Sequence, residues 1–119
     1  MPTPSEALRD FYTRFDAGDV DGLVSLFHPD GVFDVNNTRH TGHDEIREEE
    51  AGIIGQMSNR EITYTAIAES GDIAVAEAVF NADGPDGQRV ALRFAAACEL
   101  RGDKIARLSE YFDTAGMQD

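Results

Sequence analysis

The feature that most constrains the fold is a run of alternating side chains near the end of the chain. Residues 88–113 read QRVALRFAAACELRGDKIARLSEYFD, and Gly102-Asp103 supplies a turn in the middle of the run. Before the turn, apolar residues occupy every second position, and this period of two is typical of a strand with one buried face. They are Val90, Leu92, Phe94, Ala96, Cys98 and Leu100. The pattern predicts a hairpin of strands 88–101 and 104–113.

The returning strand places one carboxylate on an otherwise apolar face. Ala106, Leu108 and Phe112 share that face at period two, and Glu110 lies between the last two. Burial of a carboxyl group in an apolar wall raises its pKa toward the range that a general acid or base requires. We therefore predict a small-molecule pocket with Glu110 as its catalytic group. A bulge or a frayed strand end that turned Glu110 to solvent would remove this role.

Length and charge exclude several classes of protein. The 119 residues are enough for one domain, predicted to span 1–119, and 41% hydrophobic with 28% charged residues is a globular composition. Asp and Glu outnumber Lys and Arg by 23 to 10, which gives a formal net charge of -13. Phosphate backbones and anionic lipid surfaces repel such a chain. We expect neither a nucleic-acid partner nor a membrane partner.

The cysteine and histidine content gives no sign of a metal site. Cys98 is the single cysteine and lies in an apolar strand pattern, which excludes an internal disulfide and a cysteine-based zinc site. His40 and His43 with Asp44 match no established metal-ligand spacing. We expect no metal and no organic cofactor. Residues 1–10 show no basic and apolar leader, so a cytoplasmic location is expected.

The remaining sequence predicts an α+β domain. Thr3-Pro4-Ser5-Glu6 resembles a capping box that opens a first helix, Asp19 caps a second, and Thr41 with Asp44 resembles a capping box for a third. Further strands are predicted at residues 32–36, 61–69 and 73–82, with polar loops at 28–31 and around 36–42. Two helices, a strand, a helix and an antiparallel meander predict helices that cover one face of a curved, mainly antiparallel sheet.

The order of these elements, with the segments AGDVDGLVSLFHPDGVFD, TGHDEIRE and GDKIARLSEYFD, resembles the nuclear-transport-factor-2-like superfamily. Within it, the chain is similar to the SnoaL-like polyketide-cyclase-like proteins and to the ketosteroid-isomerase-like proteins. The resemblance covers nearly the whole chain and implies a cone-shaped α+β barrel. Members include isomerases, cyclases, dehydratases, epoxide hydrolases and non-catalytic carriers, so the fold alone does not identify the reaction.

The functional residues of the best-known relatives do not carry over. The ketosteroid-isomerase tyrosine falls near Phe11, with Tyr12 beside it, and the base aspartate falls near Val35, with Asp34 one position short. The second acid falls near Ala96 or Cys98. The aspartate–arginine–aspartate set of the limonene-type epoxide hydrolases also has no match, because Arg93 has outward parity. The resemblance instead favours SnoaL-like chemistry, which needs an acidic base with polar helpers.

Candidate residues for that chemistry come from several elements. Tyr12 could donate a hydrogen bond into the cavity, and His40 could carry protons near its mouth. Glu49 or Glu50 could add a second carboxylate, or could form a solvated acidic face. Glu77 lies where both strand faces are apolar, so its orientation stays open. The predicted ligand contacts are Phe15, Asn36, Tyr64, Glu77, Phe94, Leu108 and Phe112.

Three hypotheses on function follow from these residues. The first is a cofactor-free enzyme of the isomerase, cyclase or dehydratase type that acts on a small hydrophobic molecule through Glu110. The second is a carrier that holds such a molecule without reaction, and the third is a protein-interaction domain with a filled cone. Ala91, Ala95 and Ala97 on the outer face of strand 88–101 would let another sheet approach closely, so a homodimer is expected.

Overall fold

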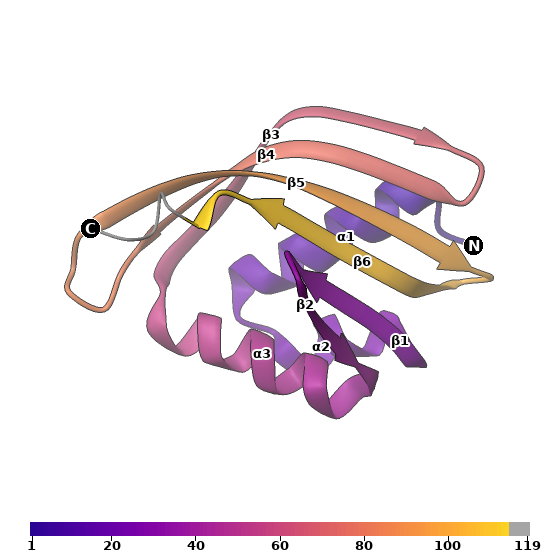
Figure 1. The fold of residues 1–119 in the computed structure, drawn as a ribbon, viewed down its shortest axis with the longest axis horizontal. Coiled ribbons are helices and arrows are strands. Elements are labelled where there is room, and N and C mark those ends of the chain that lie inside the picture. The colour runs from indigo at the N-terminus through magenta and orange to yellow at the C-terminus, as the bar shows by residue number, and fades with distance from the viewer. Residues whose placement is uncertain (115–119) are drawn as a thin grey trace.

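The computed structural model describes residues 1–114, which form three helices and one six-stranded sheet (Figure 1). The helices are α1 (Pro4–Ala17), α2 (Val20–Ser25) and α3 (Gly42–Gln56). The strands are β1 (Phe27–Val35), β2 (Thr38–Thr41), β3 (Ser58–Ser70), β4 (Ile73–Asp83), β5 (Arg89–Arg101) and β6 (Lys104–Phe112). The last five residues of the predicted domain lie outside the described part of the chain.

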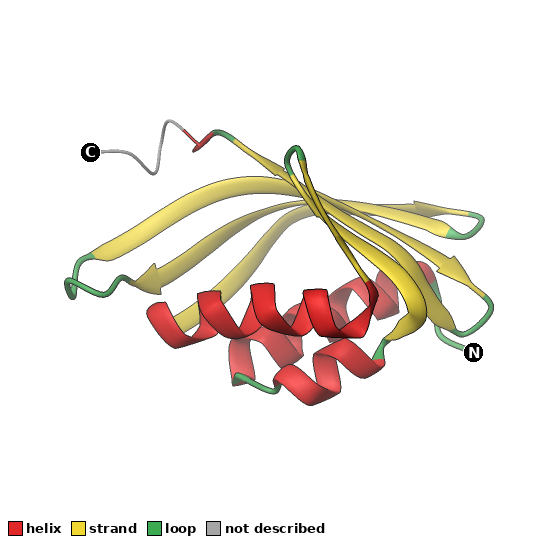
Figure 2. Ribbon diagram, turned by 60° about the horizontal axis from the view of Figure 1, so that its bottom comes forward, coloured by secondary structure: helices red, strands yellow, loops and turns green. Residues whose placement is uncertain are grey.

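The sheet is curved and mostly antiparallel, and its strand order is β2-β1-β6-β5-β4-β3. The pairing of β1 with β6 is parallel, whereas the other four neighbouring pairs are antiparallel. All three helices lie on the same side of the sheet (Figure 2). The predicted α+β architecture, with three helices packed on a curved sheet in a cone-shaped arrangement, is therefore confirmed.

Side chains cap the first two helices as the sequence predicts. Thr3 accepts a hydrogen bond from the Glu6 backbone N–H, and Glu6 accepts one from the Thr3 N–H, so the capping box is complete. Gly18 ends α1 in the left-handed conformation with φ 76°, which glycine adopts without strain. Asp19 then caps α2 by accepting from the Gly22 N–H at 3.0 Å.

The third helix begins where it was predicted, but a different acid caps it. Thr41 is the N-cap residue, and its side chain makes no capping hydrogen bond. The Glu45 carboxylate accepts from the Thr41 N–H at 2.8 Å, so the reciprocal half of the cap comes from Glu45 rather than from Asp44. Gly42, which follows Thr41, has φ 86°, in the left-handed region that glycine adopts without strain.

The predicted inward face of residues 88–101 is correct. Ala96, Cys98 and Leu100 are buried, whereas Arg93 and Arg101 are exposed on the other face. The core beneath this face is formed mainly by the large side chains Leu8, Phe11, Leu23, Phe27, Phe33, Ile46, Ile105 and Leu108, which are almost fully buried. Burial of this apolar surface is the main term that stabilises the fold.

The first half of β6 departs from the predicted alternation. Leu100 pairs with Ile105 and Glu99 pairs with Arg107, so Ala106 is an extra residue at a register shift. This bulge turns Ile105 inward in place of Ala106. The prediction that Ala106 belongs to the inner face is therefore wrong. Regular pairing resumes after Arg107, where Leu108 is again buried.

The chain also forms more strand than the sequence predicts. Residues 28–31, which read as a turn, belong to an irregular start of β1, where the register shifts between Phe27 and Val32. A Cβ atom at Gly31 would lie 3.0 Å from the Ile105 carbonyl oxygen, so this close approach of β1 to β6 needs glycine. The predicted polar loop near 36–42 is a hairpin in which Asn36-Asn37 joins β1 to β2.

Arg60 ties the ends of two helices to β3. Its guanidinium donates hydrogen bonds to the carbonyl oxygens of Phe15 and Asp16, at the end of α1, and of Ile54 and Met57, at the end of α3. A cation at two helix C-termini also interacts favourably with both helix dipoles. Arg60 thus fixes α1 and α3 relative to each other. Among the described residues, no helix is long and apolar enough to cross a membrane.

Candidate functional site

A cavity of about 120 Å³ lies between α1, α3 and the inner face of the sheet. Its lining residues are Tyr12 and Phe15 from α1, Glu49, Glu50 and Ile53 from α3, Val35 from β1, and Ile62, Phe80, Leu92, Phe94, Glu110 and Phe112 from the remaining strands. Most of this wall is aromatic or aliphatic. The polar groups are one tyrosine hydroxyl and three carboxyls, so any chemistry in the cavity depends on these four side chains.

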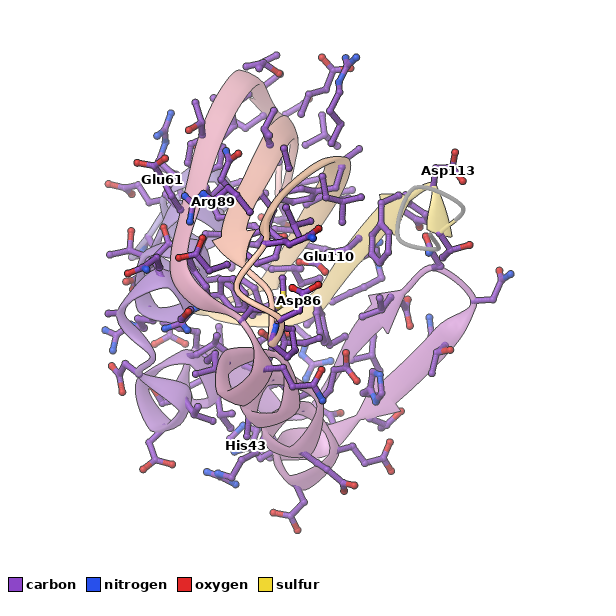
Figure 3. All side chains as sticks on the ribbon, turned by 90° about the vertical axis from the view of Figure 1, so that its left-hand side faces the viewer. His43, Glu61, Asp86, Arg89, Glu110 and Asp113 are labelled. Carbon is purple, nitrogen blue, oxygen red and sulfur yellow. The ribbon has the colours of Figure 1, made fainter. Side chains whose placement is uncertain are left out.

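Glu110 lies in the wall of this cavity. On β6 it pairs with Ala96 of β5 and with Val35 of β1, and regular alternation after the bulge turns its side chain inward. Figure 3 shows Glu110 near the middle of the molecule, whereas Asp113, three residues later, lies toward the edge. Burial raises the pKa of Glu110 to about 7, although the hydrogen bond from Tyr12 acts in the opposite direction. A carboxyl with this pKa exchanges protons readily at neutral pH.

Tyr12 donates a hydrogen bond of 2.6 Å from its hydroxyl to Glu110 Oε2. Its ring is buried and packs against three other rings, with centroid distances of 4.9 Å to Phe11, 5.5 Å to Phe94 and 6.4 Å to Tyr64. Burial and the Glu110 charge raise the pKa of Tyr12 well above its ordinary value. The phenol therefore keeps its proton and acts as a fixed donor to Glu110.

Glu50 supplies a second carboxyl to the same cavity. It is 4% exposed on the inner side of α3, and no other described residue forms a hydrogen bond or ion pair with it. Burial, followed by the charge of Glu110, raises the pKa of Glu50 well above its ordinary value. The sequence signal was present, because Glu50 follows the buried Ile46 by four residues on one helix face. That spacing alone did not separate a buried acid from a solvated one.

Asn36 positions the end of β6 rather than lining the cavity. Its backbone N–H donates to the Glu110 carbonyl oxygen at 2.9 Å, and its side-chain oxygen accepts from the Phe112 N–H at 3.0 Å. Asn36 has φ 53°, in the left-handed region that asparagine tolerates better than most residues. It thus holds the backbone from the Glu110 carbonyl to the Phe112 N–H. The predicted contact of Asn36 with a ligand is not what the structure shows.

The other predicted ligand contacts divide into two groups. Phe15, Phe94 and Phe112 line the cavity together with Tyr12 and Glu110. Leu108 is fully buried in the core, and Tyr64 is half-buried with the Arg9 guanidinium 4.7 Å from its ring centre. Neither of these two side chains lines the cavity.

Glu77 lies on the opposite side of the sheet. Ala76 and Ala78 point inward, so the period of β4 turns Glu77 outward, where it is exposed. Its predicted place in the cavity is therefore wrong. The sequence left the orientation of Glu77 open because Val75 and Val79 make the outer face of β4 apolar as well.

His40 lies outside the cavity, on β2. Its Nε2 atom is 3.6 Å from Glu49 Oε1, and its ring centre is 6.2 Å from that of Phe33. Glu49 lines both the cavity and a surface hollow that includes His40. His40 does not line the cavity and reaches the interior only through Glu49, so its predicted role near the cavity mouth stays a prediction.

The positions of this chain that match the catalytic residues of ketosteroid isomerases carry other side chains. Val35 occupies the lining position of the base, and Phe11 is buried in the core. Asp34 turns to the other face, where it pairs with Arg39 and accepts from Ser109. Arg93 is exposed on the outer face, as its parity predicts. In residues 1–114, no group of three or more His, Cys, Asp or Glu side chains is placed to hold a metal ion.

A family model for SnoaL-like domains matches residues 8–108. The chain belongs to this family. The match includes most of α1, all of α3 and most of the sheet, and it confirms the resemblance seen in the sequence. No curated protein matches this SnoaL-like domain.

Solved structures with the same fold resemble this SnoaL-like domain over nearly its whole length. A ketosteroid-isomerase-like protein from Catenulispora acidiphila, in complex with trimethylamine, is 22% identical, with a TM-score of 0.86, over 97% of this chain and 90% of that one. TerC, co-crystallised with polyporic acid, is 23% identical, with a TM-score of 0.84, over 96% and 94%. An NTF2-like protein of unknown function from Burkholderia pseudomallei is 19% identical, with a TM-score of 0.86, over 98% and 95%. At these identities the likeness shows the fold alone.

Proposed function

We propose that this SnoaL-like domain catalyses a cofactor-free proton transfer on a small hydrophobic molecule that carries a carbonyl or hydroxyl group. The observation that carries the proposal is the hydrogen bond between Tyr12 and Glu110 inside an apolar cavity. It fixes one carboxyl at a defined position, and burial gives that carboxyl a pKa of about 7. Isomerisation, cyclisation and dehydration of carbonyl compounds can each begin with such a proton abstraction.

The two buried carboxyls have different environments, which suits them to different roles. The Tyr12 hydroxyl stabilises the ionised form of Glu110, whereas no described residue donates to Glu50. Burial and the charge of Glu110 both keep the proton on Glu50. Glu110 would therefore act as the base, whereas Glu50 would hold its proton while the cavity is empty.

The proton that Glu110 removes would leave through Glu49 and His40. Glu49 lines the cavity on one side and lies 3.6 Å from His40 on the other, and His40 is 19% exposed. The imidazole is the side chain best suited to exchange protons with solvent near neutral pH. In this proposal Tyr12 is a positioning residue, and His40 is a proton shuttle that does not contact the substrate.

An exchange experiment tests the proposal without knowledge of the natural substrate. Small ketones are incubated in D₂O, and loss of their α-proton signals is followed by ¹H NMR with wild type, Glu110→Gln and the surface control Glu48→Gln. We expect faster exchange with wild type and Glu48→Gln, and a decrease of about 100-fold or more with Glu110→Gln. Equal exchange by wild type and Glu110→Gln would show that Glu110 is not the base.

The second candidate function is a carrier that binds its ligand in the same cavity without reaction. The apolar wall supports it, because apolar burial alone can hold a small ligand. The small molecules in two structures of the same fold, trimethylamine and polyporic acid, support ligand binding under both hypotheses. A carrier retains its affinity in Glu110→Gln and shows no α-proton exchange in any variant.

The outer face of the sheet supports the expected homodimer. Ile73, Val75 and Tyr111 are 40%, 50% and 52% exposed there, and they surround alanines at 95 and 97. Small residues allow a second sheet to pack closely, and burial of the three large side chains would stabilise the pair. The dimer and the cytoplasmic location stay predictions.

A further inference from the structure

The lining of the cavity contains several acidic side chains and no basic one among the described residues. Glu49, Glu50 and Glu110 contribute three carboxyls, and no lysine, arginine or histidine is among the described lining residues. Glu49 has a basic neighbour outside the cavity, because His40 Nε2 lies 3.6 Å from its Oε1. Among the described residues, Glu50 and Glu110 form no ion pair, so their carboxyls lack a counter-charge when ionised.

Glu50 shows most clearly that a partner is missing. It is 96% buried and lines the cavity, and no other described residue forms a hydrogen bond or ion pair with its carboxyl. Among the described residues only Asp16 Oδ1 is both fully enclosed and unpartnered, so the Glu50 oxygens stay accessible from the cavity. Ionisation of a carboxyl in so apolar a site is unfavourable unless a partner compensates its charge. A ligand that donates to Glu50 or carries a positive charge would remove this cost.

The aromatic wall indicates which kind of ligand fits. Five rings line the cavity, and they belong to Tyr12, Phe15, Phe80, Phe94 and Phe112. The face of an aromatic ring attracts a cation, most strongly where water is excluded. The carboxyls could also accept from a primary ammonium, so the rings and not the acceptors favour an alkylated one. Its methyl groups can pack against the aromatic wall.

We infer that the ligand of this cavity carries a small alkylated ammonium group, which lies against the aromatic rings with Glu50 and Glu110 as its counter-charges. The inference rests on the proposed function, because it assigns a ligand class to the same site. The volume of about 120 Å³ sets the size of the ligand. It corresponds to the space of roughly four to ten water molecules, and so to a ligand of about that many non-hydrogen atoms.

Choline and 3,3-dimethylbutan-1-ol have nearly the same shape, but choline has a charged quaternary nitrogen where the alcohol has a neutral carbon. A comparison of the two therefore measures the contribution of the charge. Binding of each to the intact protein is measured by isothermal titration calorimetry and by ¹H–¹⁵N NMR shifts. We expect choline to bind at least tenfold more tightly than the alcohol. Glu50→Gln should weaken choline at least tenfold and leave the alcohol unchanged, whereas the control Glu48→Gln should change neither. Thermal unfolding checks that both variants fold.

Release of protons gives an independent readout. The titratable groups that face Glu50 are Tyr12 on α1, Glu49 on α3 and Glu110 on β6. A cation favours the ionised form of the carboxyls, so choline binding should release protons from them near pH 7. For the same reason, the affinity for choline should increase as the pH rises from 6 to 8. Calorimetry in two buffers of different ionisation enthalpy measures this release, which should be absent for the alcohol.

Each contrary result has a separate meaning. Equal affinity for choline and the alcohol, or choline binding that Glu50→Gln does not weaken, would overturn the ammonium class and leave the proton-transfer proposal intact. Absence of binding by both probes would also overturn the ammonium class. The α-proton exchange experiment with Glu110→Gln then decides separately whether the proposed proton transfer stands.

Discussion

The Tyr12 hydroxyl donates to Glu110 Oε2 across 98 residues of sequence, at 2.6 Å. Because this hydrogen bond lowers the pKa of Glu110, Tyr12→Phe should raise that pKa further above its ordinary value. Carbon-13 NMR titration of the glutamate side-chain carboxyls measures the change directly. Tyr64→Phe is the matched control, because Tyr64 packs against Tyr12 without contacting Glu110. An unchanged Glu110 titration in Tyr12→Phe would contradict the geometry.

Stability should fall as the pH rises through the neutral range. The folded state binds more protons than the unfolded state between the ordinary glutamate pKa and the Glu110 pKa of about 7, so ionisation favours unfolding there. The cost is absent below about pH 4.5 and complete above about pH 7, and for Glu110 it amounts to roughly 3 kcal/mol. Urea unfolding at several pH values measures it.

Variants of buried and of exposed glutamates test whether this fall in stability comes from the buried carboxyls. Glu110→Gln and Glu50→Gln should each flatten the fall in stability, because each removes one buried group that resists ionisation. Glu48→Gln, on the exposed side of α3, should leave the wild-type slope unchanged. A wild type whose stability rises steadily from pH 5 to pH 7.5 would rule out the burial of these two carboxyls.

Arg60 should be among the most sensitive positions for stability. Its guanidinium donates to four carbonyl oxygens, and replacement by methionine leaves these acceptors without their charged donor. We expect Arg60→Met to cost about 2–5 kcal/mol in urea unfolding. Arg101→Met is the control, because it removes only an exposed ion pair with Asp30 and should cost far less. Similar costs for both variants would refute the role of Arg60 as a tie between helices.

The outer face of the sheet should determine the oligomeric state. Light scattering after gel filtration should give twice the 13.0 kDa mass of one chain. Ala95→Glu places like charges opposite each other in a symmetric interface and should yield monomers. Ala51→Glu, at an exposed position on α3, should leave the dimer intact. A monomeric wild type at high micromolar concentration would exclude this interface.

Local patterns were sufficient to predict most of the fold. The capping residues Thr3 and Asp19 mark helix starts because their hydrogen bonds involve neighbours three residues away. The alternation of residues 88–101 is equally local, and it gave the inward face of β5. The alternation of Leu108, Glu110 and Phe112 likewise turned Glu110 toward the inner face, and the bulge does not disturb it because the bulge lies before Leu108.

The errors arose where distant contacts decide the structure. The extra residue Ala106 in β6 responds to the pairing with β5, and Gly31 in β1 responds to the approach of the Ile105 backbone. Neither contact leaves a periodic signal in its own segment.

The candidate site was predictable only in part for the same reason. Tyr12 and Glu110 were each suggested by one-dimensional patterns, but Glu50 was distinguished from Glu49 only by the packing of α3 against the sheet. Glu77 was ambiguous because both faces of β4 are apolar, one toward the core and one toward solvent. Alternation along β4 therefore does not show which of its two apolar faces is buried against the core.

The parallel pairing of β1 with β6 fixes when the site can form during protein synthesis. A ribosome delivers all three helices and five strands before it delivers Glu110, so Tyr12 emerges long before its acceptor. Until β6 inserts between β1 and β5, the nascent chain exposes the apolar hollow and two unpaired strand edges. Translation that stopped before the last strand would thus yield an aggregation-prone fragment without its proposed base, so assembly of the site coincides with closure of the sheet.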